Sequence, residues 1–235
     1  MKGIPREVED QKKHRITNSQ AIRSLRDNFF LNSEQKSVLI GTLLGDGSLS
    51  KNGWAKNYRL NMIQGDAQKE YLFWKFQLFR NACCSEPSYQ KWNRSWLIRT
   101  ISHSAFNNYA ETFYAGGKKI IPRTIAQFLD PLALAVWFMD DGALGGRGEG
   151  YILNTQSFSY KENEVLRLGL QERFSAKVSI HKDKKWWRLY IWKGSMDNFR
   201  NIIDPYVIPA IRYKLYAFDP VETTRGLSTK VEMKI

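Results

Sequence analysis

The stretch that decides the fold is an apolar segment that ends in two carboxylates and a glycine, Leu134-Ala135-Val136-Trp137-Phe138-Met139-Asp140-Asp141-Gly142. Asp130 and Pro131 before it are typical of a helix N-cap and first turn, and Gly142 is typical of a left-handed C-terminal cap. These signals predict a short helix over residues 131–141. Its last turn carries both aspartates, although the unpaired carbonyl groups there disfavour carboxylates by about 0.3–1 kcal/mol each. A bound metal ion would explain this placement.

An earlier stretch ends in the same way, Leu39-Ile40-Gly41-Thr42-Leu43-Leu44-Gly45-Asp46-Gly47. Asn32 and Ser33 are both available as its N-cap, so the pattern predicts a helix over residues 34–45. Both predicted helices are apolar until their last residues, where each carries an aspartate followed by glycine.

The spacing of other residues around the two aspartates indicates an internal duplication. Asp141 follows Asp46 by 95 residues (141 − 46). Lys119 follows Asp46 by 73 residues (119 − 46), and Lys214 follows Asp141 by the same 73 (214 − 141). Between them, the pattern Tyr-x-Leu-Asn occurs in both halves, at residues 58–61 and 151–154. We therefore predict two homologous halves, each with one acidic helix end and one late lysine.

The charge of the chain is its most informative bulk property. The 235 residues carry a net charge of +13, and 14% of them are aromatic, which predicts a nucleic-acid partner. An apolar content of 43% excludes a disordered chain. The only cysteines, Cys83 and Cys84, are adjacent, so they cannot form a disulfide framework or a zinc site, and they indicate a reducing compartment. No apolar run is long enough for a membrane span or a signal peptide, so we expect no membrane partner and function where the protein is made.

Hydrophobic periodicity and turn signals predict an α+β fold in which a helix, strands, a helix, a hairpin and a helix occur twice. The first half has expected helices over 34–45, 68–79 and 105–114 and strands over 48–51, 58–64, 88–92 and 95–102. The second half has expected helices over 131–141, 160–174 and 196–203 and strands over 151–158, 177–181 and 186–192. A further short helix is expected over 17–28. The predicted divisions are an N-terminal extension (1–30), a first half (31–125), a second half (126–217) and a C-terminal tail (218–235).

Packing of the two acidic helices would create a metal site. Small residues in each helix allow close approach, namely Gly41, Gly45, Ala133 and Ala135. Asp46 and Asp141 would then meet and form an oxygen-only site suited to Mg²⁺, with the backbone carbonyls of Gly45 and Asp140 as candidate further ligands. Such ions can activate water and stabilise the leaving oxygen in phosphodiester hydrolysis. Lys119 and Lys214 are candidate catalytic residues that steady the developing charge.

The two predicted sheets offer side chains for duplex DNA, because a two-stranded ribbon fits the major groove. Candidates for base contacts are Arg59, Asn61, Gln64, Arg99, Asn154, Gln156 and Arg188. Candidates for phosphate contacts are Lys51, Lys56, Lys91, Arg94, Lys182, Lys184 and Lys185. For each of these residues the alternative is an ordinary solvated strand or turn position. Other chemistries lack support, because the three histidines are scattered and the Gly-rich segment 145–150 lacks the lysine and preceding strand of a phosphate loop.

These residues resemble the LAGLIDADG homing endonucleases, of the single-chain type with two motifs. Residues 39–47 and 134–142 align with the nine-residue motif, and the similarity extends over about residues 34–216. The resemblance implies a monomeric pseudo-dimer of two αββαββα repeats, with the motif helices at the interface and two antiparallel sheets forming a saddle for DNA. It also implies staggered cleavage of a long asymmetric duplex site, leaving 3′ overhangs.

The resemblance implies a role for each residue of the expected active site. Asp46 and Asp141 would share two or three Mg²⁺ or Mn²⁺ ions, and Lys119 and Lys214 would be the basic residues of the site. Motif one departs from the pattern with Leu44 and Gly45 before its acid.

Three functions stay open from the sequence. The first is an intron-encoded, site-specific DNA endonuclease. The second is an RNA maturase of the same fold, with intron RNA as partner. The third is a catalytically silent DNA-binding regulator. Retention of both aspartates and both lysines favours the first. The expected location is an organelle if the source is eukaryotic and the cytoplasm otherwise.

Overall fold

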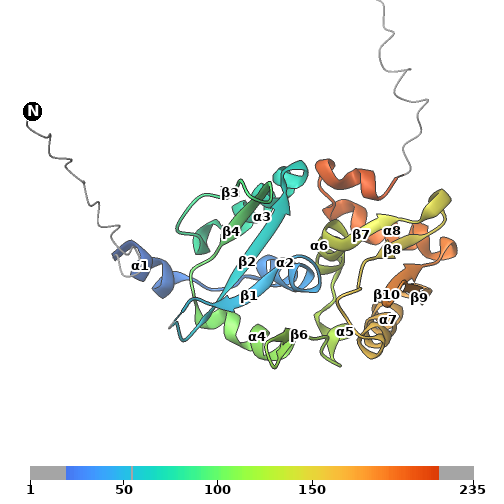
Figure 1. Cartoon of the computed structure of the whole chain (residues 1–235), viewed down its shortest axis with the longest axis horizontal. Helices are drawn as coiled ribbons and strands as arrows, with labels where there is room; N and C mark the ends of the chain where they lie inside the picture. Colours follow the sequence, from blue (N-terminus) through green and yellow to red (C-terminus); the bar gives the residue numbers. More distant parts are fainter. Residues whose placement is uncertain (1–19, 54, 217–235) are drawn as a thin grey trace, which may run out of the picture.

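Two apolar helices lie side by side at the centre of the protein, with one half of the chain on either side of them (Figure 1). They are α2 (Ser33–Leu44) and α6 (Pro131–Asp141). This computed structural model describes residues 20–53 and 55–216. The start of the predicted N-terminal extension and of its helix, and the predicted tail over 218–235, lie outside the described residues.

Capping residues fix where the two central helices begin. The side chain of Asn32 accepts a hydrogen bond from the Gln35 backbone N–H (2.8 Å), and the Gln35 side chain accepts one from the Asn32 N–H, so α2 begins with a capping box. Asp130 accepts from the Ala133 N–H (2.7 Å), and Pro131 occupies the first turn of α6. The predicted bounds of α6 are confirmed, and α2 differs from its predicted range by one residue at each end.

Small residues bring α2 and α6 close together, as predicted. A Cβ atom added at Gly41 would lie 2.4 Å from the Ala133 carbonyl oxygen, and one at Gly45 would lie 2.4 Å from Cβ of Asp140. Both helices are buried on nearly all sides, with Leu39 and Val136 fully inaccessible. Helices that are apolar all round belong inside a core, and these two form the core between the halves.

The prediction of a left-handed Gly142 was wrong. Gly142 has φ −76° and ψ 151°, an extended conformation, because it begins strand β7 (Gly142–Leu144). Its lack of a side chain is required for a different reason. A Cβ here would lie 2.4 Å from the carbonyl oxygen of Phe138 and 2.3 Å from its ring, so the chain can turn this tightly only at glycine.

The first half has the predicted order of elements. Its strands are β1 (Ser48–Lys51), β2 (Tyr58–Gly65), β3 (Ser88–Gln90) and β4 (Ser95–Arg99), and its helices after α2 are α3 (Lys69–Leu78) and α4 (Asn107–Phe113). The strands form one antiparallel sheet in the order β1-β2-β4-β3. A two-stranded hairpin, β5 (Tyr114–Ala115) with β6 (Lys118–Lys119), was not predicted. It turns at Gly116 and Gly117, which have positive φ angles of 56° and 78°.

The second half repeats this architecture. Its elements after α6 are β7, β8 (Tyr151–Leu153), α7 (Tyr160–Phe174), β9 (Val178–Asp183), β10 (Trp186–Ile191) and α8 (Met196–Ile203). The sheet order β7-β8-β10-β9 matches that of the first half. The expected strand over 151–158 is shorter, because the chain turns after Leu153 and Asn154 N–H bonds back to the Asp141 carbonyl (3.0 Å). The α+β fold of two αββαββα repeats is therefore confirmed.

Short helices complete the described chain. They are α1 (Gln20–Asn28), α5 (Ile125–Phe128) and the 3-10 turns η2 (Asp66–Gln68), η3 (Arg80–Ala82), η4 (Ser104–Phe106), η5 (Gly146–Gly148), η6 (Lys193–Ser195), η7 (Asp204–Tyr206) and η8 (Pro209–Lys214). Helix α5 packs against α7 and so belongs structurally with the second half. The hairpin β5–β6 ends with Lys119, and the turn η8 ends with Lys214, the two lysines that the sequence matches between the halves.

Each sheet has one apolar and one open face. In β2, Leu60 and Met62 are buried in the core, whereas Arg59, Asn61 and Ile63 lie on the opposite face. In β10 the buried Leu189 and Ile191 alternate in the same way with residues of the opposite face. We call these two opposite surfaces the open faces. They are the surfaces that the sequence predicts to contact DNA.

The contact between Gly41 and Ala133 gives a test of the packing. We expect Gly41→Ala to lower the free energy of unfolding by about 1–3 kcal/mol, because overpacking outweighs the better helix propensity of alanine. Gly65→Ala is the matched control, since a Cβ there would have no neighbour within 4 Å. Urea unfolding followed by circular dichroism measures both. Equal stabilities of the two variants would contradict the close packing of α2 on α6.

Candidate active site

The two motif aspartates meet in one cavity between the halves. Asp46 follows the end of α2, and Asp141 is the last residue of α6. Both line a cavity of about 390 Å³, together with Gly45, Lys119, Asn154, Gln156 and Ser157. Asp46 is exposed and Asp141 is half-buried. The packing of the helices therefore brings the two acids to one place.

At the C-terminal end of each motif helix, a lysine donates hydrogen bonds to backbone carbonyls. Lys119 Nζ donates hydrogen bonds to the carbonyls of Gly45 (2.9 Å) and Gly47 (2.8 Å). Lys214 Nζ donates to those of Met139 (2.6 Å) and Asp140 (2.9 Å). Positive charge at the partly negative end of a helix is favourable, so the lysines offset the cost of placing aspartates there. The carbonyls of Gly45 and Asp140, expected as metal ligands, are lysine acceptors in this structure.

Burial and charge act in opposite directions on these lysines. Burial lowers the pKa of Lys119 and of Lys214, while the nearby carboxylates of Asp46, Asp140 and Asp141 raise it.

Asp141 is the strongly perturbed acid of the cavity. Burial raises its pKa to about 8, and the negative charges of Asp46 and Asp140 add to the shift, while Lys119 and Lys214 oppose it. A carboxyl group in such surroundings favours its neutral form unless further positive charge is supplied. A bound divalent cation would supply that charge.

Gln64 lies in a different place from the one expected for a base-contacting residue. It is 3% exposed, and its Nε2 donates to Oδ2 of Asp46 and Oδ1 of Asp140, both at 3.0 Å. Alternation along β2 explains this, because Gln64 shares the core-facing side with Met62, and Arg59 and Asn61 lie on the other side. Its assignment to base readout was wrong.

Lys75 is a site residue that sequence reasoning missed. It is fully buried in α3, and its Nζ lies 2.7 Å from Oδ1 of Asp140. The available signal was its position, since Lys75 stands four residues after Tyr71 and next to Phe76, on the apolar side of the helix. A lysine in that stripe needs a buried partner.

Most other predicted DNA contacts lie at or beside the open faces. Arg59 and Arg99 are neighbours on the first sheet; burial lowers the pKa of Arg59, and the charge of Arg99 lowers it further. Two guanidinium groups held together in this way favour an anion between them. In the second half, Arg188 lies on the open face of β10, and Asn154 donates to the Asp141 carbonyl (2.9 Å).

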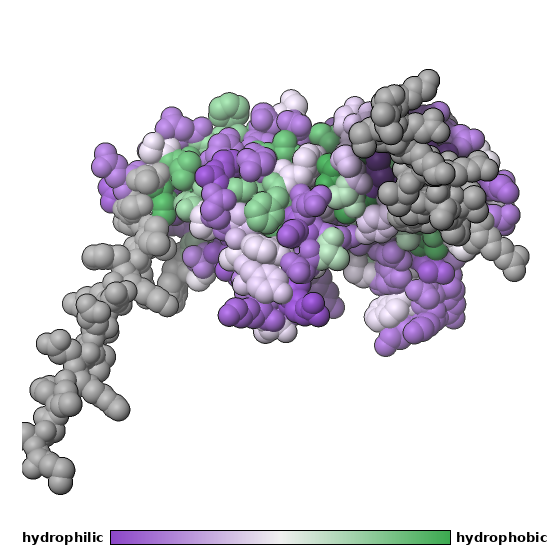
Figure 2. Space-filling view, turned by 90° about the horizontal axis from the view of Figure 1, so that it is seen from above, coloured by the Kyte–Doolittle hydropathy of each residue, from purple (hydrophilic) through white to green (hydrophobic). Residues whose placement is uncertain are grey.

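The remaining candidates differ in how they are placed. Gln156 lies beyond β8 and bonds to Asp183 (3.1 Å). Lys182 pairs in register with Trp187, whose ring packs against Tyr160 of α7, so Lys182 lies on the α7 side of the sheet. The exposed candidates are Lys51 at the end of β1 and the turn or loop residues Lys56, Lys91, Arg94, Lys184 and Lys185. They lie at the ends of the sheet strands or in the connections between them, and hydrophilic residues cover the lower parts of both lobes in Figure 2.

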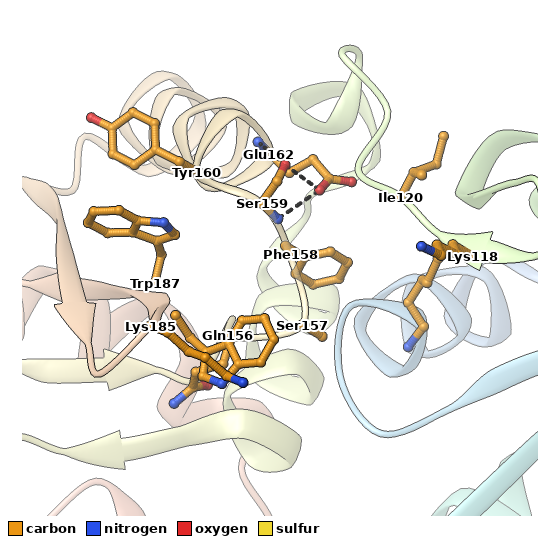
Figure 3. Close-up of a pocket in the computed structure, with 12 residues that line it drawn as sticks. Lys118, Ile120, Gln156, Ser157, Phe158, Ser159, Tyr160, Glu162, Lys185 and Trp187 are labelled. Carbon is orange, nitrogen blue, oxygen red and sulfur yellow. Dashed lines mark hydrogen bonds between the residues drawn. The ribbon is translucent and has the colours of Figure 1, made fainter.

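A second cavity adjoins the first. It has a volume of about 690 Å³ and shares Lys119, Gln156 and Ser157 with the aspartate cavity. Figure 3 shows Tyr160 and Trp187 along one side of it, with Lys118 and Ile120 opposite. Phosphate and base groups both suit such a mixed basic and aromatic lining.

The carboxylates present fit a magnesium site completed by substrate. Within the residues that the structure describes, no group of three or more His, Cys, Asp or Glu side chains forms a ligand set supplied by the protein alone. Mg²⁺ in proteins commonly binds one or two carboxylates and completes its shell with water and phosphate oxygens. Asp46 and Asp141 match that requirement.

Comparisons with known proteins agree with this geometry. The model of the LAGLIDADG DNA endonuclease family matches residues 36–199, and the chain belongs to this family. A cytochrome b mRNA maturase bI2 of Debaryomyces hansenii is 34% identical over 79% of this chain and 74% of its own length. A probable intron-encoded endonuclease 1 of Wickerhamomyces canadensis is 30% identical over 84% of this chain and 91% of its own. The chain spans about half (48%) of the bI2 maturase of Saccharomyces cerevisiae.

Solved structures show the same architecture. The homing endonuclease I-WcaI, bound to its DNA recognition sequence, superposes with a TM-score of 0.79 at 28% identity, over 86% of this chain and 95% of that one. I-DmoI, in complex with nicked target DNA and in the presence of Mn, shares the fold with a TM-score of 0.52 at 17% identity, over 73% of this chain and 95% of that one. Among the described helices, none is long and apolar enough to cross a membrane.

The raised pKa of Asp141 predicts how pH and Mg²⁺ act on stability. An aspartate of the unfolded chain titrates near pH ~3.9, whereas Asp141 in the fold titrates near pH 8. Between these values the folded state holds one more proton, so the contribution of Asp141 to stability falls as pH rises from about 4 to 8. Because Mg²⁺ requires the carboxylate, we expect Mg²⁺ to raise the Tm more at about pH 8.5 than at about pH 6.

Thermal unfolding with and without Mg²⁺ at the two pH values measures this effect. Asp141→Asn is the control, because it removes the titrating group and should abolish the pH dependence of the Mg²⁺ increment. An equal increment at both pH values in the wild type would refute the assignment of Asp141 as a ligand.

Proposed function

We propose that this protein is an intron-encoded endonuclease that makes a staggered double-strand break at a long, asymmetric DNA site, using Mg²⁺ held by Asp46 and Asp141. The observation that carries the proposal is the meeting of these two acids, one from each repeat, in a cavity lined by residues of both halves. Each repeat brings one acid and one lysine, so a single chain has the parts needed to act on both strands.

The charge of the protein supports duplex DNA as its substrate. The net charge is +13, and several exposed lysines, with Arg94, lie at the ends of the sheet strands or in the turns between them. Contacts of these side chains with phosphates would give affinity, while those on the strands themselves would read base edges in the major groove. Family membership and the likeness to I-WcaI, which was solved on its DNA recognition sequence, support the same substrate. The two repeats within one chain support action as a monomer.

The metal requirement is part of the proposal. Asp46 and Asp141 would hold two or three Mg²⁺ or Mn²⁺ ions, which when bound activate water and stabilise the leaving oxygen. Lys119 and Lys214 hold the two helix ends in place and add positive charge beside the scissile phosphates. The carboxylate of Asp46 is in addition held by Gln64.

The closeness of the two acids supports a staggered cut. Both line one cavity of about 390 Å³, so they can serve two phosphates only where the strands come near each other. The minor groove of B-DNA is about 6 Å wide, and phosphates facing each other across it are offset toward their 3′ ends. Cleavage there leaves 3′ overhangs.

The decisive experiment is cleavage of a plasmid that carries the uninterrupted insertion sequence of the intron encoding this chain. We expect the wild type to linearise it with Mg²⁺ and to leave 3′ overhangs, mapped by sequencing both cut ends. Asp46→Asn and Asp141→Asn should each lose activity by about 100-fold or more, because each removes a carboxylate that holds the cation. Undiminished cutting by either variant would exclude that residue as a ligand, and blunt ends would exclude the minor-groove geometry.

A second candidate function is that of an RNA maturase. It is favoured by the 34% identity to the bI2 maturase of D. hansenii, which is named for cytochrome b mRNA and points to an organellar setting. Filter binding of the host intron RNA, in competition with the target duplex, separates the two functions. We expect the duplex to bind at least about tenfold more tightly at equal salt concentration, because the open faces suit a duplex groove. Tighter binding of the intron RNA would favour the maturase function.

A further inference from the structure

A buried ion pair next to Asp46 and Asp141 joins the two halves. Nζ of Lys75 in α3 lies 2.7 Å from Oδ1 of Asp140 in α6, and the side chains are 1% and 0% exposed. The Lys75 ammonium also lies 4.2 Å from the centre of the Tyr71 ring, and the Tyr71 hydroxyl donates to the carbonyl of Val136 (3.1 Å). Residues of the first half therefore hold a carboxylate that belongs to the motif helix of the second.

Stability alone does not account for charges at this position. Burial removes water from both ions, and apolar residues of similar size are often equally stable or more stable in such places. The role of the Lys75–Asp140 ion pair therefore depends on which neighbouring side chain it holds in place.

The group that it orients is the amide of Gln64. Nε2 of Gln64 lies 3.0 Å from Oδ1 of Asp140 and 3.0 Å from Oδ2 of Asp46. An amide nitrogen carries two hydrogens, so one can point to each carboxylate. Because Lys75 fixes the Asp140 carboxylate, Asp140 sets the orientation of the amide, and the amide holds Asp46. The chain of contacts ends at a catalytic acid.

The contacts that run from Lys75 through Asp140 and Gln64 reach Asp46, and the other motif has no equivalent of Asp140. The position equivalent to Asp140 in the first motif is Gly45, and a Cβ there would lie 2.4 Å from Cβ of Asp140. Only one side chain fits between the helix ends. The Asp141 carboxylate accepts no hydrogen bond from any side chain in the described part of the chain. The two catalytic acids thus differ in how firmly they are held.

We propose that Lys75, Asp140 and Gln64 are positioning residues that fix the carboxylate of Asp46 and support cleavage of one DNA strand more than cleavage of the other. The inference rests on the proposed endonuclease function. If the protein acts as proposed, with one acid from each half, each scissile phosphate would lie nearer to one of the two acids. Loss of these contacts should therefore slow cleavage of the strand whose scissile phosphate lies nearer to Asp46.

Two variants test this inference. Lys75→Met/Asp140→Ala removes both charges together, so that neither is left buried and unpaired, and Gln64→Met removes the amide while leaving the ion pair. Lys69→Met is the matched control, because Lys69 is an exposed lysine of the same helix. The rate of nicking is measured on each strand separately, with a cognate duplex labelled at one 5′ end or the other, over a series of Mg²⁺ concentrations.

We expect both variants to nick one strand about 10- to 100-fold more slowly, because loss of contacts that support a metal ligand has effects of this size at other metal sites. The rate of nicking of the other strand should fall less than about threefold. Nicked duplex should accumulate, and the slowed strand should require more Mg²⁺. Equal slowing of both strands, or no slowing, in variants with the wild-type Tm would overturn the proposal. If the double variant does not fold, Gln64→Met alone decides.

A second readout does not depend on cleavage. In protein labelled with ¹⁵N-glutamine, the side-chain amide of Gln64, assigned by its absence in Gln64→Met, should exchange slowly with solvent in the wild type and rapidly in the double variant. Slow exchange retained in the double variant would show that the ion pair does not hold Gln64. If the wild type and Lys69→Met cut no duplex, the proposed function fails, and amide exchange still decides whether the positioning contacts exist.

Discussion

The close packing of α2 on α6 is the constraint on which the rest of the structure depends. Gly41 allows the two backbones to approach so closely that any added Cβ would collide with the Ala133 carbonyl. This contact joins the halves through a shared core and leaves both helix ends at one point. The two motif acids, one from each half, are therefore placed by the same contact that holds the halves together, so both halves are needed to bring Asp46 and Asp141 to one cavity.

The electrostatics of the centre follow from that convergence. Two helix C-termini and three aspartates concentrate negative charge, and burial raises the pKa of Asp141 to about 8. Lys119, Lys214 and Lys75 offset this charge, and their ammonium groups bond to backbone carbonyls or to Asp140, not to the carboxylates of Asp46 and Asp141. Neither motif carboxylate is therefore bonded to one of these lysines, although Asp46 accepts a hydrogen bond from Gln64. Under the proposed function, a cation would offset this negative charge, and substrate oxygens would complete the ligands around it.

The two repeats share a topology but differ at the centre. Their sheets have matching strand orders, and their lysines bind matching helix ends. The difference lies between the two helix ends, where space exists for the side chain of Asp140 and not for one at Gly45. A duplicated fold has in this way acquired two inequivalent acids, which suits a DNA site whose halves differ in sequence.

The sequence by itself determined the duplication, the order of the main helices and strands, and which two aspartates end the apolar helices. These features depend on local patterns: capping residues, apolar periodicity and the matched spacing of Asp46, Asp141, Lys119 and Lys214. It could not place Gln64 or Lys75 correctly. Which residues of β2 and α3 face the centre depends on strand register and on helix rotation, and both are set by packing between distant segments. The same holds for Gly142, whose need for glycine comes from the Phe138 ring and not from its own backbone angles. Local sequence patterns determine which helices and strands form and which residues end them. Only the packing between distant segments determines which side chains meet at the centre.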